Sequence, residues 1–147
     1  MKNHEAVMIL LAEDDPGHAV LVEKNLRRAG IANEIVTVDN GQKAVDFLLK
    51  QEGDTADRHP APVLILLDLN MPVLDGYQAL KIIKNDECTE RIPVVILTTT
   101  DNPQEIARCS DLGCNVYVTK PVEYDRFSEA IRNLGLFLSI VKITGKE

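Results

Sequence analysis

Residues 62–72, with the sequence PVLILLDLNMP, decide the fold class of this chain. The segment begins as a continuous apolar run, which is typical of a β-strand that other elements cover on both faces. The run ends in a carboxylate, Asp68, and burying an unpaired carboxylate is energetically costly. We therefore expect Asp68 to lie at the exposed end of a buried strand, beside a cation, or both.

Strand and helix patterns alternate along the rest of the chain. Strand patterns occur at residues 6–12, 33–38, 62–68, 92–98 and 114–119, and the first, third and fourth are apolar nearly throughout. Helical patterns occur at residues 15–30, 40–50, 76–86 and 123–142, and another follows a cap at Asp101 or Asn102. Five strands that alternate with five helices predict an α/β fold, with a parallel sheet and helices on both faces.

Length and charge narrow the class of protein. The 147 residues suffice for one domain with a hydrophobic core, and no composition shift marks a second domain. The formal net charge of −7 argues against nucleic-acid binding, because proteins that bind the phosphate backbone usually carry a basic excess. No apolar run approaches the roughly 20 residues that span a bilayer. Three cysteines without a Cys-x-x-Cys pair, and no signal peptide, predict reduced thiols and a cytoplasmic location.

Polar side chains follow four of the predicted strands. Because the carboxyl ends of parallel strands meet at one edge of an open sheet, and ligands bind there, we expect these side chains to share one site. The residues concerned are Glu13, Asp14, Asp68, Asn70, Thr98, Thr99 and Lys120.

The acidic residues of this set predict a site for Mg²⁺, which prefers oxygen ligands and keeps several of its waters. Asp14 and Asp68 can each supply one oxygen, Asn70 can add its backbone carbonyl, and Glu13 can hold a metal-bound water. Lys120 offsets part of the negative charge. A phosphoryl group on Asp68 would then find Mg²⁺, an ammonium and a hydroxyl around its oxygens, which suits phosphorylation of the carboxylate.

Four motifs, in their order and spacing, resemble the receiver domain of two-component response regulators. They are LAEDDP at residues 11–16, LLDLNMPVLDG at 66–76, VVILTTTD at 94–101 and NVYVTKP at 115–121. The resemblance implies a flavodoxin-like, doubly wound fold of five βα units with strand order 2-1-3-4-5. The resemblance covers roughly residues 7–141. We expect one receiver domain, residues 1–147, and no output domain.

The resemblance also implies a role for each residue of the site. Asp68 would accept phosphate from a histidine kinase, with Glu13, Asp14, Asp68 and the Asn70 carbonyl around Mg²⁺. Thr98, Thr99 and Lys120 would contact the phosphate, Thr98 and Tyr117 would form the switch, and Lys120-Pro121 would be a cis peptide. Such a protein signals by protein contact and is not an enzyme in the ordinary sense. Taken alone, Thr99 is more typical of a loop and Tyr117 of a core.

Several features that are less specific than these motifs resemble the single-domain regulators that partner bacterial phytochrome histidine kinases. They are the long polar linker at 51–61, the sequence LLDLNMP, the triple threonine and the apolar LFLSIV near the C-terminus.

Two other interpretations use the same residues. A phosphatase or phosphotransferase of the haloacid-dehalogenase type also uses an aspartate nucleophile, but it needs an acid two residues on, where this chain has Asn70. A receiver-like scaffold that is never phosphorylated would be expected to lack Asp68 or Lys120. A dinucleotide-binding enzyme is excluded because no G-x-G-x-x-G follows the first strand.

The last helical pattern carries two apolar faces. With residues about 100° apart, Phe127, Ile131, Leu134, Leu138 and Val141 form a stripe that should pack on the sheet. Leu136, Ile140 and Ile143 fall on nearly the opposite side, and an exposed apolar patch of this kind usually marks an interface. We therefore predict a homodimer through these three residues. The alternative is that Gly135 ends the helix and the last residues fold back onto the core.

Overall fold

Five parallel strands form a single sheet with the order β2-β1-β3-β4-β5. In the computed structural model, the described residues are 8–49, 62, 64–99, 102–114, 116–120 and 122–133. The strands are β1 (Met8–Ala12), β2 (Glu34–Val38), β3 (Leu64–Asp68), β4 (Val94–Thr98) and β5 (Val116–Thr119). This order confirms the predicted flavodoxin-like α/β fold.

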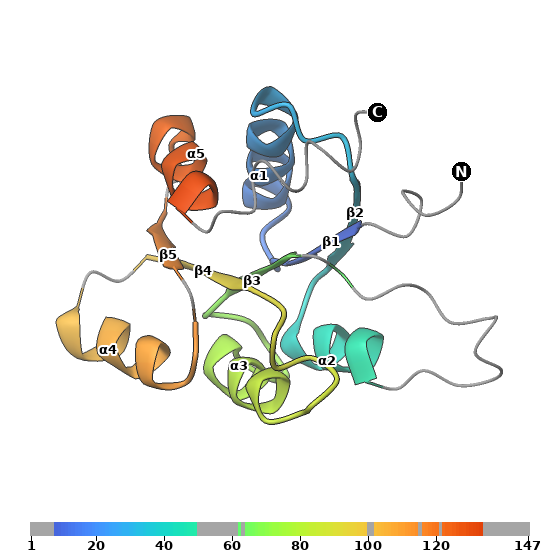
Figure 1. Ribbon diagram of the computed structural model, residues 1–147, viewed down its shortest axis with the longest axis vertical. Helices are drawn as coiled ribbons and strands as arrows, with labels where there is room; N and C mark the ends of the chain where they lie inside the picture. Colours follow the sequence, from blue (N-terminus) through green and yellow to red (C-terminus); the bar gives the residue numbers. More distant parts are fainter. Residues whose placement is uncertain are drawn as a thin grey trace, which may run out of the picture.

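Five helices cover the two faces of the sheet (Figure 1). They are α1 (Pro16–Arg28), α2 (Gly41–Leu49), α3 (Gly76–Lys84), α4 (Pro103–Asp111) and α5 (Tyr124–Asn133). The helices α1 and α5 lie on one face, and α2, α3 and α4 lie on the other (Figure 1). None of the described helices is both long enough and apolar enough to span a membrane.

The three central strands are buried at every position, as their continuous apolar sequences predicted. Successive side chains of a strand point to opposite faces, so each central strand contributes to two cores. Leu66 packs with α1 and α5, whereas the next residue, Leu67, packs with α2, α3 and α4. The two edge strands, β2 and β5, are only partly buried. The apolar sequence of residues 64–67 therefore reflects a strand with helices on both sides.

Side-chain caps fix where the helices begin, directly after the loops at the carboxyl edge of the sheet. Asp15 caps α1 by accepting a hydrogen bond from the Gly17 N–H at 2.8 Å. Asn102 caps α4 by accepting from the Gln104 N–H at 2.8 Å, while Asp101 lies outside the described residues. Asp75 and Gln78 form a reciprocal capping box at the start of α3.

Gly76 allows α3 to begin against the end of β3. A Cβ atom at this position would lie 2.4 Å from the backbone oxygen of Asp68, a contact that no side chain makes without a backbone shift. The absence of a side chain therefore brings the first turn of α3 directly against the backbone of Asp68.

Several sequence predictions fall outside the described residues. Leu136, Ile140 and Ile143 of the predicted dimer interface lie there, and so does Pro121 of the predicted cis peptide. Both remain predictions. Within α5, Phe127 and Ile131 are fully buried against the sheet, as the predicted inner stripe requires.

The loop between β3 and α3 holds Val73 in an unfavourable backbone conformation. Its φ is +70°, and the Leu74 N–H donates to the Pro72 carbonyl at 2.7 Å, which closes a γ-turn around Val73. The γ-turn with positive φ is rare and strained, and β-branched residues seldom adopt positive φ. The Val73 side chain is 78% exposed, so packing does not compensate for this strain.

Replacing Val73 with asparagine should therefore stabilise the protein. Asparagine tolerates positive φ, so Val73→Asn is expected to raise the free energy of unfolding by about 1 kcal/mol in urea titrations. Val20→Asn is the matched control, because Val20 is also exposed (49%) but lies in α1. The control should not stabilise the protein. An equal change in both variants would show that backbone strain at Val73 is not the cause.

Candidate functional site

The parallel sheet brings polar residues from four strands to one edge. Glu13 and Asp14 follow β1, Asp68 ends β3, Thr98 ends β4 and Lys120 follows β5. The register aligns these ends, because Asp68 pairs with Leu97 and Thr98 pairs with Thr119. These strand ends lie at one edge of the sheet, beside the loops that lead into α1 and α3 (Figure 1). The fold thus assembles groups that are up to 107 residues apart in the sequence.

Three carboxylates gather at this edge. Glu13, Asp14 and Asp68 each place one carboxylate oxygen within 4.8 Å of the other two. Glu13 and Asp68 are buried, with 2% and 1% of their surface exposed, whereas Asp14 is exposed. Like charges this close repel one another and favour the binding of a cation.

Lys120 supplies the positive charge nearest to these acids. Its ammonium nitrogen lies 2.9 Å from Oε1 and 3.1 Å from Oε2 of Glu13, and 3.2 Å from Oδ2 of Asp68. Burial lowers the pKa of this ammonium, but its contacts with Glu13 and Asp68 outweigh burial and raise the pKa above its usual value. Lys120 is therefore a charged lysine that links two buried carboxylates.

The carboxyl group of Asp68 is held on both sides. Oδ2 faces Lys120, and Oδ1 accepts a hydrogen bond from the Asn70 N–H at 3.3 Å. Burial and the charge of Glu13 raise the pKa of Asp68 to about 7, although Lys120 and the Asn70 N–H act in the opposite direction. The Lys120 ammonium therefore only partly offsets the cost of burying the Asp68 carboxylate beside Glu13.

The Glu13 carboxylate keeps an oxygen without a hydrogen bond. Oε2 accepts from the backbone N–H of Asp15 at 3.1 Å and from Lys120. Oε1 is buried and has no hydrogen-bond partner among the described residues, since the Lys120 ammonium lies close to it but not at a bonding angle. A buried oxygen whose one polar contact in the described part of the chain is this ion pair with Lys120, beside two other carboxylates, is consistent with the acidic donor set of a hydrated divalent cation.

The remaining predicted site residues differ in exposure. Thr98 is buried, whereas Thr99 and Asn70 are exposed. The backbone N–H of Lys120 donates to the Thr98 carbonyl at 2.7 Å, so β5 holds Lys120 next to the end of β4. The roles of these residues in binding a phosphate or a metal remain predictions.

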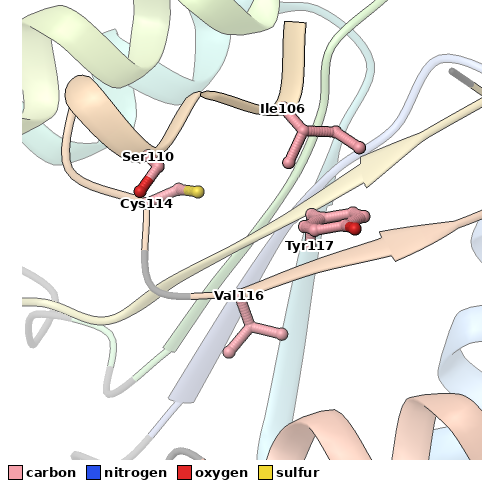
Figure 2. A pocket seen from close by; sticks show the side chains of 5 residues that line it. All are labelled: Ile106, Ser110, Cys114, Val116 and Tyr117. Carbon is pink, nitrogen blue, oxygen red and sulfur yellow. The ribbon is translucent and has the colours of Figure 1, made fainter. Parts of the chain in front are cut away.

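Tyr117 lies on the outer part of β5 and is 42% exposed. Its ring lines a pocket of about 310 Å³ between β5 and α4, shown in Figure 2, together with Ile106, Ser110, Cys114 and Val116. In this structure the ring therefore faces the α4 side of the sheet and is open to solvent.

A link between α3 and α4 was not predicted from the sequence. The Tyr77 hydroxyl donates to Glu105 at 3.0 Å, and the Arg108 guanidinium lies 4.0 Å from the centre of the Tyr77 ring. Burial and the hydrogen bond to Glu105 raise the pKa of Tyr77 to about 12. Tyr77 directly follows Gly76, so this link begins one residue from the contact with Asp68. The partners are 28 residues apart, and no sequence signal pairs them.

Comparison with known proteins places this arrangement in a family. A family model described as the response regulator receiver domain matches residues 9–132. Response regulator Rcp1 of Synechocystis is 40% identical over 113 residues, which cover 77% of this chain and 76% of Rcp1. The structure of Rcp1 in its Mn²⁺-bound form has a TM-score of 0.72 at 35% identity, and covers 88% of this chain and 92% of that one.

Two further solved structures are similar over most of their length. A response regulator receiver domain from Rhodospirillum rubrum is 50% identical, with a TM-score of 0.72, covering 92% of this chain and 95% of that one. The bacteriophytochrome response regulator RtBRR is 38% identical, with a TM-score of 0.77, and the match covers 87% of this chain and 77% of that one. The predicted likeness to phytochrome response regulators is thus confirmed, and the chain belongs to the response regulator receiver domain family.

Proposed function

We propose that this chain accepts a phosphoryl group on Asp68 from a histidine kinase, with Mg²⁺ bound, and then signals through protein contacts. The observation that carries the proposal is the buried Asp68 carboxylate between the Lys120 ammonium and two further acids. In this view the chain is a cytoplasmic signalling protein that catalyses only its own phosphorylation and dephosphorylation. Family membership argues against the haloacid-dehalogenase alternative.

The chemistry requires Asp68 to act as a nucleophile. A carboxylate oxygen attacks the phosphorus of a phosphohistidine, an O–P bond forms, and the P–N bond to the imidazole breaks. Lys120 already lies 3.2 Å from Asp68 and would neutralise negative charge on the transferred group. The Thr98 hydroxyl, at the end of the neighbouring strand, would donate a hydrogen bond to a phosphoryl oxygen, with exposed Thr99 next to it.

The acidic cluster would hold the metal ion. Asp14, Asp68 and the Asn70 carbonyl would bind Mg²⁺, Glu13 would hold a metal-bound water, and the bound ion would supply positive charge near the phosphoryl oxygens. The spacing of the three carboxylates supports this assignment, and so does Oε1 of Glu13, which accepts no hydrogen bond from the described residues. The Mn²⁺-bound form of the relative Rcp1 supports it independently.

Metal binding should stabilise the folded protein in a way that depends on Asp14. Mg²⁺ at 100 times its dissociation constant is expected to raise the free energy of unfolding of the wild type by about 2.7 kcal/mol. Asp14→Asn should lose most of this gain, because it removes one charged ligand while the exposed site leaves the fold intact. Asp39→Asn is the control, since Asp39 is an exposed acid paired with Lys43. An undiminished Mg²⁺ effect in Asp14→Asn would contradict the assignment.

Phosphorylation should occur on Asp68 alone and should need the metal. Incubation with Mg²⁺ and a small acyl phosphate is expected to add one phosphoryl group, as measured by the mass of the intact protein. Asp68→Asn and excess chelator should each abolish the addition, whereas Asp39→Asn should be labelled like the wild type. Retention of label by Asp68→Asn, or full labelling in chelator, would contradict the proposal. A wild type that is never labelled would favour the scaffold alternative.

The similarity to a bacteriophytochrome response regulator supports a phytochrome histidine kinase as the phosphodonor. Phosphotransfer from such a kinase should be at least about tenfold faster than from unrelated histidine kinases, which corresponds to ~1.4 kcal/mol in the barrier. Equal rates of phosphotransfer from all donors would contradict a phytochrome kinase as the specific partner. They would not affect the assignment of Asp68 as the acceptor.

Phosphorylation would also act on the switch pair. A phosphoryl dianion with strong acceptor oxygens attracts a nearby donor, so the Thr98 hydroxyl would turn toward it. The space left by Thr98 would admit the ring of Tyr117, which is now 42% exposed. The two arrangements need differ by only a few kcal/mol for the phosphoryl group to change their populations.

Removal of the Thr98 hydroxyl should uncouple the ring from phosphorylation. In wild type, a phosphate mimic is expected to bury Tyr117, detected as a change in its ring signals in NMR spectra of tyrosine-labelled protein. Thr98→Val keeps the shape of the side chain and should abolish this change while still binding the mimic. The rings of Tyr77 and Tyr124 serve as internal references. An unchanged Tyr117 signal in wild type, with the mimic bound, would rule out the switch.

A further inference from the structure

The C-terminus of α4 brings two cysteines together. After α4 the Gly113 N–H donates to the Ser110 carbonyl and the Cys114 N–H donates to the Cys109 carbonyl, both at 3.0 Å. Gly113 has a φ of +105°. This pair of bonds and the left-handed glycine define a Schellman motif, in which the side chains of the residues at the two ends are usually in contact. Those residues here are Cys109 and Cys114.

The backbone bond limits the separation of these cysteines. With a 3.0 Å bond between the Cys114 nitrogen and the Cys109 oxygen, the two Cα atoms are at most about 7 Å apart. Disulfides join Cα atoms up to about 6.8 Å apart. The same motif ends α1, where Leu26 and Ile31 take the equivalent positions and pack into one core. In α4 the equivalent pair also packs into one cluster, but both members are thiols.

The two thiols differ in access. Cys109 is 2% exposed, whereas Cys114 is half-buried and points into the pocket beside Tyr117 (Figure 2). Burial and the charge of Cys109 raise the pKa of Cys114 to about 11, while the nearby Lys84 ammonium acts in the opposite direction. The reactive thiolate is therefore a small fraction of Cys114 at neutral pH, and oxidation should become faster as the pH rises. The effect of Cys109 on Cys114 agrees with the closeness of the two residues. A small oxidant entering the pocket would therefore meet Cys114 first.

We propose that Cys109 and Cys114 are a site of reversible oxidation, which forms a disulfide across the end of α4 when a peroxide enters the pocket. The Cys114 thiolate attacks one peroxide oxygen, the O–O bond breaks, and hydroxide leaves and takes up a proton. The sulfur of Cys109 then attacks the sulfenic sulfur, an S–S bond forms, and the second oxygen leaves as water. Two thiols lose two electrons and two protons, and one peroxide becomes two waters.

Tryptic digestion gives a direct test. Cleavage after Arg108 places both cysteines in one peptide, because Lys120 precedes proline, whereas Cys88 falls in the separate peptide 85–91. After treatment of the folded protein with hydrogen peroxide and alkylation of free thiols, the peptide of residues 109–126 should be lighter by two hydrogen atoms and unalkylated. Dithiothreitol should restore both alkylation sites.

Variants separate this pairing from other oxidation. Cys88→Ala should leave the disulfide unchanged, whereas Cys114→Ala and Cys109→Ala should each abolish it. Circular dichroism establishes that each variant is folded. The proposal is overturned if residues 109–126 stay reduced while exposed Cys88 is oxidised, if Cys109 or Cys114 pairs with Cys88, or if the disulfide forms only in denaturing urea.

Discussion

The interaction on which the site depends is the contact of one ammonium with two buried carboxylates. Lys120 lies within 3.2 Å of both Glu13 and Asp68, and these three side chains come from loops and strands spread over the whole chain. Buried charges are tolerated only when they are paired, and breaking such a pair leaves an uncompensated charge. The arrangement holds because β1, β3 and β5 fix the three backbones, with β4 tying Lys120 to Thr98 by a 2.7 Å bond. The apolar strands therefore hold Lys120 between two carboxylates that would otherwise repel each other.

The strand order explains why the acids meet where they do. The order in which strands are added to the sheet reverses after β2. The strand β2 lies on one side of β1, whereas β3, β4 and β5 follow one another on the other side. The connections after the two central strands β1 and β3 therefore lead to opposite faces, and open α/β sheets generally bind ligands at such a switch point. Glu13, Asp14 and Asp68 lie at this switch point. The close approach of Gly76 to the Asp68 backbone adds a second support, from α3.

Much of this arrangement could be predicted from the sequence, because it follows from periodicity. Continuous apolar runs identified the buried strands, and a parallel sheet places every strand end at one edge, so Asp68 and Lys120 could be expected to meet. The structure alone supplied the contacts that depend on packing across elements. The bond between Tyr77 and Glu105 joins the outer surfaces of α3 and α4, where no pattern in either helix names its partner. The strained turn at Val73 was equally invisible, because valine is a residue that sequence statistics assign to strands.

The weak burial of α4 has a consequence for how this protein can diversify. Of its nine positions seven are exposed, and Cys109 is the one buried side chain within the helix. Most substitutions there leave the hydrophobic cores untouched, since exposed positions usually tolerate change within about 0.5 kcal/mol. The surface of α4 can therefore change in charge and shape at little risk to folding, whereas a change at the buried Glu13, Asp68 or Lys120 would leave an uncompensated charge. Different parts of one small domain thus tolerate substitution to different degrees, least at the acidic edge of the sheet and most along α4.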